Sequence, residues 1–187
     1  MSGDDNTARF ERIVQPHLGD AYALARWITG DRADAEDVVQ EACLRAFRAI
    51  GGYAGGNTRA WMLTIVRNTA YTWLARNRSA VVMGVDDLVA IESANAGQAA
   101  ASAGGCYDAN PEAELIAKAD AARLEAAITA LPPQFRDTLV LRDIQGLDYR
   151  EIAAVTEVPV GTVMSRLARA RQRLIEAIAA DDRRPDR

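Results

Sequence analysis

The stretch LDYREIAAVTEVPVGTVMSRL (residues 147–167) decides the fold of the C-terminal part of this chain. Residues 149–155 read as a short helix, residues 156–159 as a turn and residues 160–180 as a long helix. In the long segment, apolar residues recur at three- and four-residue steps, which is typical of a helix with one buried face. That face is expected to hold Val160, Val163, Leu167, Ala170 and Leu174. Two helices joined by a short turn predict a helix-turn-helix.

Helical periodicity also extends through the N-terminal part. Residues 10–27 are expected to form one helix that stops at Gly30, and a second helix begins within residues 31–34 and continues to the glycines at 51 and 52. Thr58 is the expected N-cap of a third helix over residues 59–66, which leads with little interruption into residues 68–77. No convincing strand pattern is present in the sequence.

Composition separates these two parts. Twelve of the 17 residues from 93 to 109 are Ala, Gly or Ser, which is typical of a flexible linker that buries little apolar surface. The prediction is therefore an all-α protein with a first domain over residues 1–78, a linker over residues 79–111 and a second domain over residues 112–187.

The net charge of −4 by itself argues against nucleic-acid binding, but this charge is distributed unevenly along the chain. Residues 1–78 and residues 131–187 each hold ten arginines and nine acids, for +1, whereas residues 79–130 hold two cations and eight acids, for −6. The acidic charge is thus concentrated in the middle, and both ends are free to present basic surfaces.

Two stretches without Asp or Glu supply such surfaces. Residues 42–85 combine six arginines with Phe47, Tyr53, Trp61, Tyr71 and Trp73, and cations with aromatic faces are what single-stranded nucleic acid requires. Residues 158–175 carry four arginines on the second helix of the helix-turn-helix. These arginines fit either the solvated face of an amphipathic helix or a helix that enters a major groove, and the helix-turn-helix spacing favours the groove.

The sequence gives little support for a zinc protein, a disulfide-stabilised protein, an enzyme or a membrane protein. Cys43, Cys106 and His17 cannot build a structural zinc site or a disulfide framework, and His17 has no nucleophile or metal-ligand cluster beside it, so neither a catalytic site nor a cofactor is expected. His17 is read as a surface or packing residue. No signal segment or membrane span is evident, so the protein is expected to be cytoplasmic and not inserted into a membrane.

Several motifs resemble those of bacterial sigma factors. DAEDVVQEA (residues 34–42) and AWMLTIVRNTA (residues 60–70) resemble region two, and LPPQFR (131–136), GLDYREIA (146–153) and GTVMSRLARAR (161–171) resemble region four. Both regions in that order, with no region-three domain between them, resemble the extracytoplasmic-function (ECF, group IV) sigma factors.

The resemblance implies partners for the first domain. In the family, the helix with the acidic motif docks on the clamp helices of the polymerase β′ subunit, which assigns core contacts to Asp37, Gln40, Glu41 and Leu44; the β subunit is a further expected partner. A simpler interpretation is that Asp34, Glu36 and Asp37 only stabilise the start of a helix. This interpretation does not explain Gln40 and Glu41.

The resemblance also assigns −10 recognition to the following segment, where a base of the melted non-template strand is extruded into a pocket. Asn68 matches the residue that contacts that base, and Arg67, Arg76 and Arg78 are expected to hold backbone phosphates. Tyr71 or Trp73 would offer a stacking face, whereas Trp61 is expected in the core.

Duplex recognition at −35 falls to the second helix of region four. The expected contacts are Thr162, Met164, Ser165, Arg166, Ala168 and Arg169. Met164 stands where many relatives carry Lys or Arg, and Ala168 where some carry a larger side chain, so the −35 sequence preference is left open.

The family further implies a linker that threads through the polymerase and an anti-sigma factor that wedges between the domains. The linker acids Asp86, Asp87 and Glu92 fit either mimicry of nucleic acid or a soluble spacer, and Cys106 is weak grounds for an oxidant sensor. The alternative function is a stand-alone helix-turn-helix transcriptional regulator that binds duplex DNA without polymerase.

Overall fold

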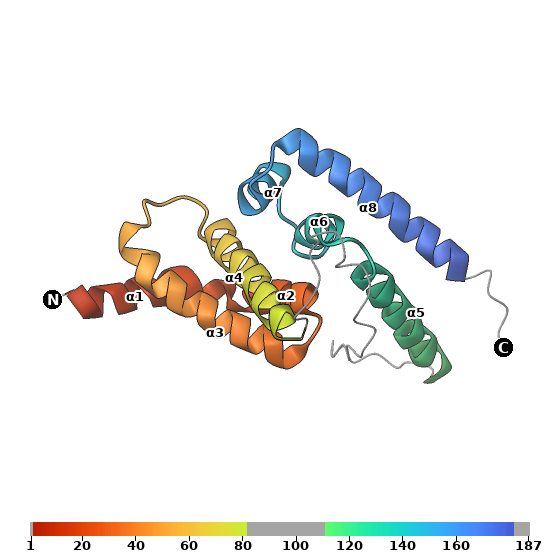
Figure 1. Cartoon of the computed structure of the whole chain (residues 1–187), viewed down its shortest axis with the longest axis horizontal. Coiled ribbons are helices and arrows are strands. Elements are labelled where there is room, and N and C mark those ends of the chain that lie inside the picture. Colours follow the sequence, from red (N-terminus) through yellow and green to blue (C-terminus); the bar gives the residue numbers. More distant parts are fainter. Residues whose placement is uncertain (1, 82–110, 182–187) are drawn as a thin grey trace.

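The structure is a computed structural model that describes residues 2–81 and 111–181, and within these ranges every regular element is a helix (Figure 1). Helices α1 to α4 form one bundle, and α5 to α8 form a second bundle beside it (Figure 1). The all-α prediction is confirmed for the described residues, and the linker predicted around residues 93–109 lies outside them.

The N-terminal bundle is built around α2, α3 and α4, which pack on one another. Its core consists of fully buried aliphatic side chains, among them Leu24, Val38, Ile50, Met62, Leu63 and Val66. The elements are α1 (Ser2–Val14), the 3₁₀ helix η1 (Gln15–His17), α2 (Leu18–Thr29), α3 (Arg32–Ala49), the 3₁₀ helix η2 (Ile50–Gly52) and α4 (Thr58–Val81).

Three expectations for this bundle need correction. The single helix predicted over residues 10–27 is interrupted by η1, because Pro16 has no N–H to donate and its ring disfavours a continuous helix. Helix α4 is capped by Asn57 rather than by Thr58, since the Asn57 side-chain oxygen accepts a hydrogen bond from the Ala60 N–H at 2.9 Å. The same helix runs without a break to Val81, past the expected helix end at residue 77.

The C-terminal bundle carries the predicted helix-turn-helix as α7 (Tyr149–Thr156) and α8 (Val160–Asp181). Asp148 and Glu151 form a capping box at the start of α7, and Glu157 takes a left-handed conformation at its end (φ 56°), which turns the chain into α8. Before them come α5 (Pro111–Thr129), α6 (Pro133–Leu139) and one π-helical turn, η3 (Val140–Ile144), and Gly146 follows this turn with φ 71°.

The predicted buried face of α8 is largely confirmed. Val163, Leu167 and Ala170 are buried and Leu174 packs partly against the core. Val160 is the exception, with 37% of its surface exposed, because it begins the helix directly after the turn at Pro159.

The two bundles touch along one side. Helix α4 lies beside α7 (Figure 1), and α2 contacts α6 and η3. The face of α4 that meets the second bundle includes Arg67 and Tyr71 from the acid-free stretch, so this contact determines how the candidate DNA-binding residues are presented.

Candidate nucleic-acid interface

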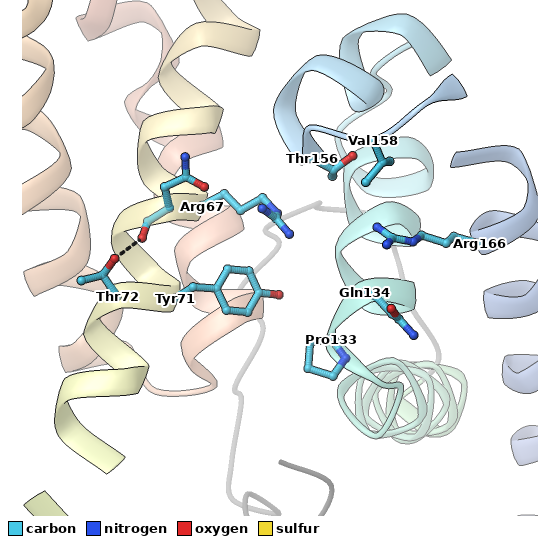
Figure 2. Close-up of a pocket in the computed structure, with 9 residues that line it drawn as sticks. Arg67, Tyr71, Thr72, Pro133, Gln134, Thr156, Val158 and Arg166 are labelled. Carbon is cyan, nitrogen blue, oxygen red and sulfur yellow. Dashed lines mark hydrogen bonds between the residues drawn. The ribbon is translucent and has the colours of Figure 1, made fainter. Parts of the chain in front are cut away.

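A cleft of about 550 Å³ lies between part of α4 and the C-terminal bundle. Figure 2 shows Arg67 and Tyr71 pointing from α4 toward the C-terminal bundle, Thr72 on another side of α4, and Arg166 extending from α8 toward the cleft. The cleft, called the interdomain cleft below, is lined by Arg67, Asn68, Tyr71, Thr72, Pro133, Gln134, Thr156, Val158 and Arg166. It therefore brings together residues predicted for two different DNA elements.

Asp137 of α6 joins the two bundles at one edge of this cleft. Arg67 donates a hydrogen bond from Nε to Asp137 Oδ2 at 2.9 Å, and the Tyr71 hydroxyl lies 2.8 and 2.7 Å from the two carboxylate oxygens. The Arg67 guanidinium also stacks over the Tyr71 ring, 4.9 Å from its centroid. Only 1% of the Asp137 side chain and 19% of the Arg67 side chain are exposed.

Burial shifts the pKa values of both Asp137 and Tyr71. It raises the pKa of the Asp137 carboxyl, and the positive charge of Arg67 and the hydrogen bond from Tyr71 oppose that rise. Burial and then the charge of Asp137 raise the pKa of the Tyr71 hydroxyl, which therefore stays protonated and donates a hydrogen bond to the carboxylate.

Asn68 stands next to these residues but is left exposed in the cleft. Its backbone carbonyl accepts a hydrogen bond from the Thr72 hydroxyl at 2.8 Å, drawn as the dashed line in Figure 2. The structure thus brings together Arg67, Asn68 and Tyr71 of the predicted −10 set. Arg76 is exposed farther along α4, and the side chain of Arg78 lies outside the described residues.

The tryptophans expected near this surface are both half-buried. Trp61 packs on Tyr53, with ring centroids 4.8 Å apart, so its predicted core position is only partly reached. Trp73 packs against the core, and its indole N–H is buried without a hydrogen-bond partner among the described residues. Of the two predicted stacking faces, Tyr71 is therefore the one that faces the cleft.

The predicted −35 residues lie in the first turns of α8. Met164 (53% exposed), Ser165, Ala168 and Arg169 are exposed, and Thr162 is half-buried. Arg166 differs from them because its side chain is half-buried and lines the interdomain cleft. Farther along α8, Arg171 pairs with Asp143 at 2.7 Å and Arg173 lies over the Phe135 ring, 4.9 Å from its centroid, so these two arginines are used within the bundle.

The predicted core-binding residues share one exposed face of α3. Asp37 and Gln40 are exposed, and Leu44 has 59% of its surface exposed. Glu41 accepts a hydrogen bond from Arg45 Nη2 at 2.6 Å, which holds the pKa of its carboxyl below the usual value. Asp31 caps the helix, since its carboxylate accepts from the Ala33 and Asp34 N–H groups. The acids at the start of α3 therefore have different surroundings from the exposed residues farther along the helix.

Asp137 was not among the site residues predicted from the sequence. Asp137 lies between Arg136 and Thr138, so its immediate neighbours in the sequence do not indicate that its carboxylate is buried and needs partners. The partners themselves are 66 and 70 residues away in sequence, and no local pattern identifies them.

Comparisons with known proteins agree with the motifs. Residues 13–80 match sigma-70 region 2, and residues 121–174 match sigma-70 region 4. The chain is 34% identical over 172 residues to the ECF RNA polymerase sigma factor SigE of Mycolicibacterium smegmatis, with 91% of this chain and 62% of that protein covered. It is 37% identical over 156 residues to the ECF RNA polymerase sigma-E factor of Escherichia coli, with 81% and 76% covered.

Solved structures show the same fold. The sigma factor RpoE from Bartonella quintana, in complex with the anti-sigma factor NepR, superposes with a TM-score of 0.66 at 26% identity, covering 92% of this chain and 98% of that one. CnrH, in complex with the cytosolic domain of CnrY, gives a TM-score of 0.61 at 24% identity, with 92% and 88% covered.

Within residues 2–81 and 111–181, none of the helices has the length and apolar character needed to cross a membrane. Both sigma modules are present, in the family's order, along a chain that is 34% and 37% identical to two curated members. The chain belongs to the ECF RNA polymerase sigma factors.

Proposed function

We propose that this protein is a cytoplasmic group IV (ECF) sigma factor that binds core RNA polymerase, recognises −35 and −10 promoter elements and promotes DNA melting. The observation that carries the proposal is that two separate surfaces bear nucleic-acid chemistry, one on α4 and one on α8. A duplex-binding regulator needs only the second. Nucleotidyl transfer belongs to the polymerase, and the sigma factor supplies recognition.

At −10, the amide of Asn68 can pair with the edge of an extruded base while Arg67, Arg76 and Arg78 hold phosphates. The Tyr71 ring offers a stacking face, and such stacking contributes about 1–3 kcal/mol per base. Holding a base in this way offsets the few kcal/mol that unstacking costs, which favours the melted promoter.

At −35, α8 enters the major groove with its N-terminal half. Thr162, Ser165, Arg166 and Arg169 donate to base edges or phosphates, while Met164 and Ala168 offer apolar contacts. Arginine is suited to bidentate pairing with guanine, so Arg166 and Arg169 are the residues that would read sequence.

Core polymerase binds the exposed face of α3. Leu44 supplies apolar contact, Gln40 a hydrogen-bonding amide, and Asp37 and Glu41 negative charge toward basic β′ clamp helices. The proposed organisation has a first domain over residues 1–78, a linker over residues 79–111 and a second domain over residues 112–187. It would allow the protein to contact the β subunit as well while its two domains bind the two promoter elements.

An anti-sigma factor is a further proposed partner. The similar structure of RpoE at 26% identity is of a complex with the anti-sigma factor NepR. A protein that covers α4 or α8 in this chain would block the surfaces assigned to DNA.

The test combines the purified protein with sigma-free core polymerase and sequences run-off transcripts from fragmented genomic DNA. Defined start sites with shared upstream elements are expected, and they should be lost with Asn68→Ala or Arg169→Ala. Arg173→Ala is the matched control, because this arginine packs on Phe135 within the bundle. Absence of transcripts together with failure to co-elute with core would favour the stand-alone regulator.

A further inference from the structure

We infer that α8 recognises its duplex element partly through the 5-methyl groups of thymine, which it contacts with the exposed side chains of Val160 and Met164. These two residues are called the apolar patch below. Thymine at fixed positions of the −35 element is then a specificity determinant, in addition to any arginine contacts. The inference rests on the proposed function, because it takes the N-terminal half of α8 as the part that enters a major groove.

The apolar patch lies on the exposed side of α8. Val160 is 37% exposed and Met164 is 53% exposed. They are four residues apart, which makes them neighbours on a helix surface, and exposed Ala168 continues the same row. The residues that join α8 to the core, such as Val163 and Leu167, are buried on the other side. The patch is therefore not part of the core and is available to a partner.

Hydrogen-bonding groups are scarce beside the patch. Gly161 has no side chain, and a Cβ at its position would meet nothing within 4 Å among the described residues. The Ser165 hydroxyl donates to the Thr162 carbonyl at 3.0 Å, so its proton is already engaged within the helix. A base edge that approaches this side of α8 therefore meets mainly apolar carbon.

Charge indicates which partner fits the patch. It lies within residues 158–175, a stretch without Asp or Glu that carries four arginines, and Arg169 is exposed one turn farther along the helix. Such surroundings favour the phosphates of duplex DNA. In the major groove, the 5-methyl group of thymine is the apolar group that distinguishes one base edge from the others, and apolar side chains contact it.

The size of the patch limits which thymines it can contact. With a rise of about 1.5 Å per residue, Val160 and Met164 are separated by about 6 Å along the helix axis. Successive bases of one strand are about 3.4 Å apart. The two side chains therefore reach thymines that are no more than about two steps apart.

The test removes the methyl group and leaves base pairing intact. In a promoter obtained from the run-off experiment, 2′-deoxyuridine replaces each thymine of the −35 element in turn, and fluorescence anisotropy measures the affinity of holoenzyme for each duplex. We expect one or two neighbouring substitutions to weaken binding by about fourfold each, as follows from the loss of one buried methyl group. The other substitutions should have little effect.

Three variants connect this effect to the patch. Met164→Ala should abolish the deoxyuridine effect at one sensitive position, because the methyl group has then already lost its contact, and Met164→Leu should retain it. Ile175→Ala is the matched control, since it removes a side chain that is 63% exposed on the same helix but outside the patch. The control should leave every deoxyuridine effect unchanged.

The outcomes separate this inference from the proposed function. Promoter-specific transcription with no sensitivity to any deoxyuridine, or with effects that all persist in Met164→Ala, would overturn the inference alone. An equal loss of affinity by Met164→Ala on thymine and deoxyuridine duplexes, together with weaker binding to core, would assign the patch to a protein partner and also overturn it. Absence of any defined start site would overturn the proposed function and this inference together.

Discussion

The Gln145 side chain donates a hydrogen bond to the backbone carbonyl of Asp20 at 2.9 Å, across 125 residues of sequence and between the two bundles. Its own side-chain oxygen is buried without a partner among the described residues, so the amide is only half satisfied. Gln145→Ala should therefore lower the free energy of unfolding by about 0.5–1.5 kcal/mol, the usual contribution of a neutral hydrogen bond. Urea unfolding measures the difference, and Gln134→Ala, an exposed residue of the cleft wall, is the control. A free energy of unfolding that Gln145→Ala leaves unchanged would contradict the prediction.

Leu44 is exposed over 59% of its surface on the face of α3 assigned to core polymerase. Leu44→Ala should weaken the affinity for core by about five- to tenfold, as expected for an apolar anchor, while the melting temperature stays unchanged because little buried surface is lost. Fluorescence anisotropy with sigma-free core and thermal melting check the two expectations. Arg32→Ala, exposed at the start of the same helix, should change neither quantity. A fall in both affinity and stability would indicate that Leu44 has a folding role instead.

Arg169 and Arg173 lie one turn apart on α8 but have different surroundings. Arg169 is exposed, whereas Arg173 stacks over Phe135. Arg169→Ala should weaken binding of holoenzyme to a −35 duplex and, if this arginine holds a phosphate, reduce the salt slope of log Kd by about one. Arg173→Ala should leave the slope unchanged and lower the thermal stability slightly. Filter binding at several salt concentrations separates the two, and equal slopes for Arg169→Ala and the parent would count against a phosphate contact.

The cap of α3 predicts a pH dependence. Hydrogen bonds from the Asp34 and Ala33 N–H groups lower the pKa of Asp31 from its ordinary value of 3.8. Because the folded-state pKa is depressed, this contribution to stability is present above 3.8 and is lost as the pH falls through the folded-state value. The destabilisation caused by Asp31→Ala should therefore be larger at pH 7 than at pH 3 in urea unfolding.

Asp31→Asn provides the control for that measurement. Asparagine keeps a side-chain oxygen that can cap the helix but does not titrate. The stability difference between the Asn and Ala variants should thus be the same at both pH values. A destabilisation by Asp31→Ala that does not change with pH would show that the charge of Asp31 does not contribute.

Local sequence signals predicted most of the helices. The apolar spacing of α8, the acids at the start of α3 and the glycines after it carry their information within a few residues. The errors arose where neighbouring signals compete. Pro16 interrupts a strong apolar period, and Asn57 and Thr58 are both good caps, of which the structure uses the first.

The candidate site was only half predictable. Arg67, Asn68 and Tyr71 follow from composition and motif, but their enclosure by a second bundle depends on contacts between residues far apart in sequence. Asp137 lies between Arg136 and Thr138, so the sequence does not indicate its burial, and the residues that bind it cannot be predicted from spacing. Arg166 likewise fits the amphipathic pattern of α8, while its direction into the cleft is set by tertiary packing.

The double use of Arg67 and Tyr71 limits how this protein can evolve. A substitution at either position that changes the proposed promoter contacts also changes the contact between the two bundles, because the same side chains bind Asp137. A shift of promoter preference would thus also change the stability of that contact unless a second substitution compensates. Changes at Gln145 or Glu151 leave the proposed DNA contacts untouched, so they offer selection a way to adjust the contact between the bundles independently of promoter preference.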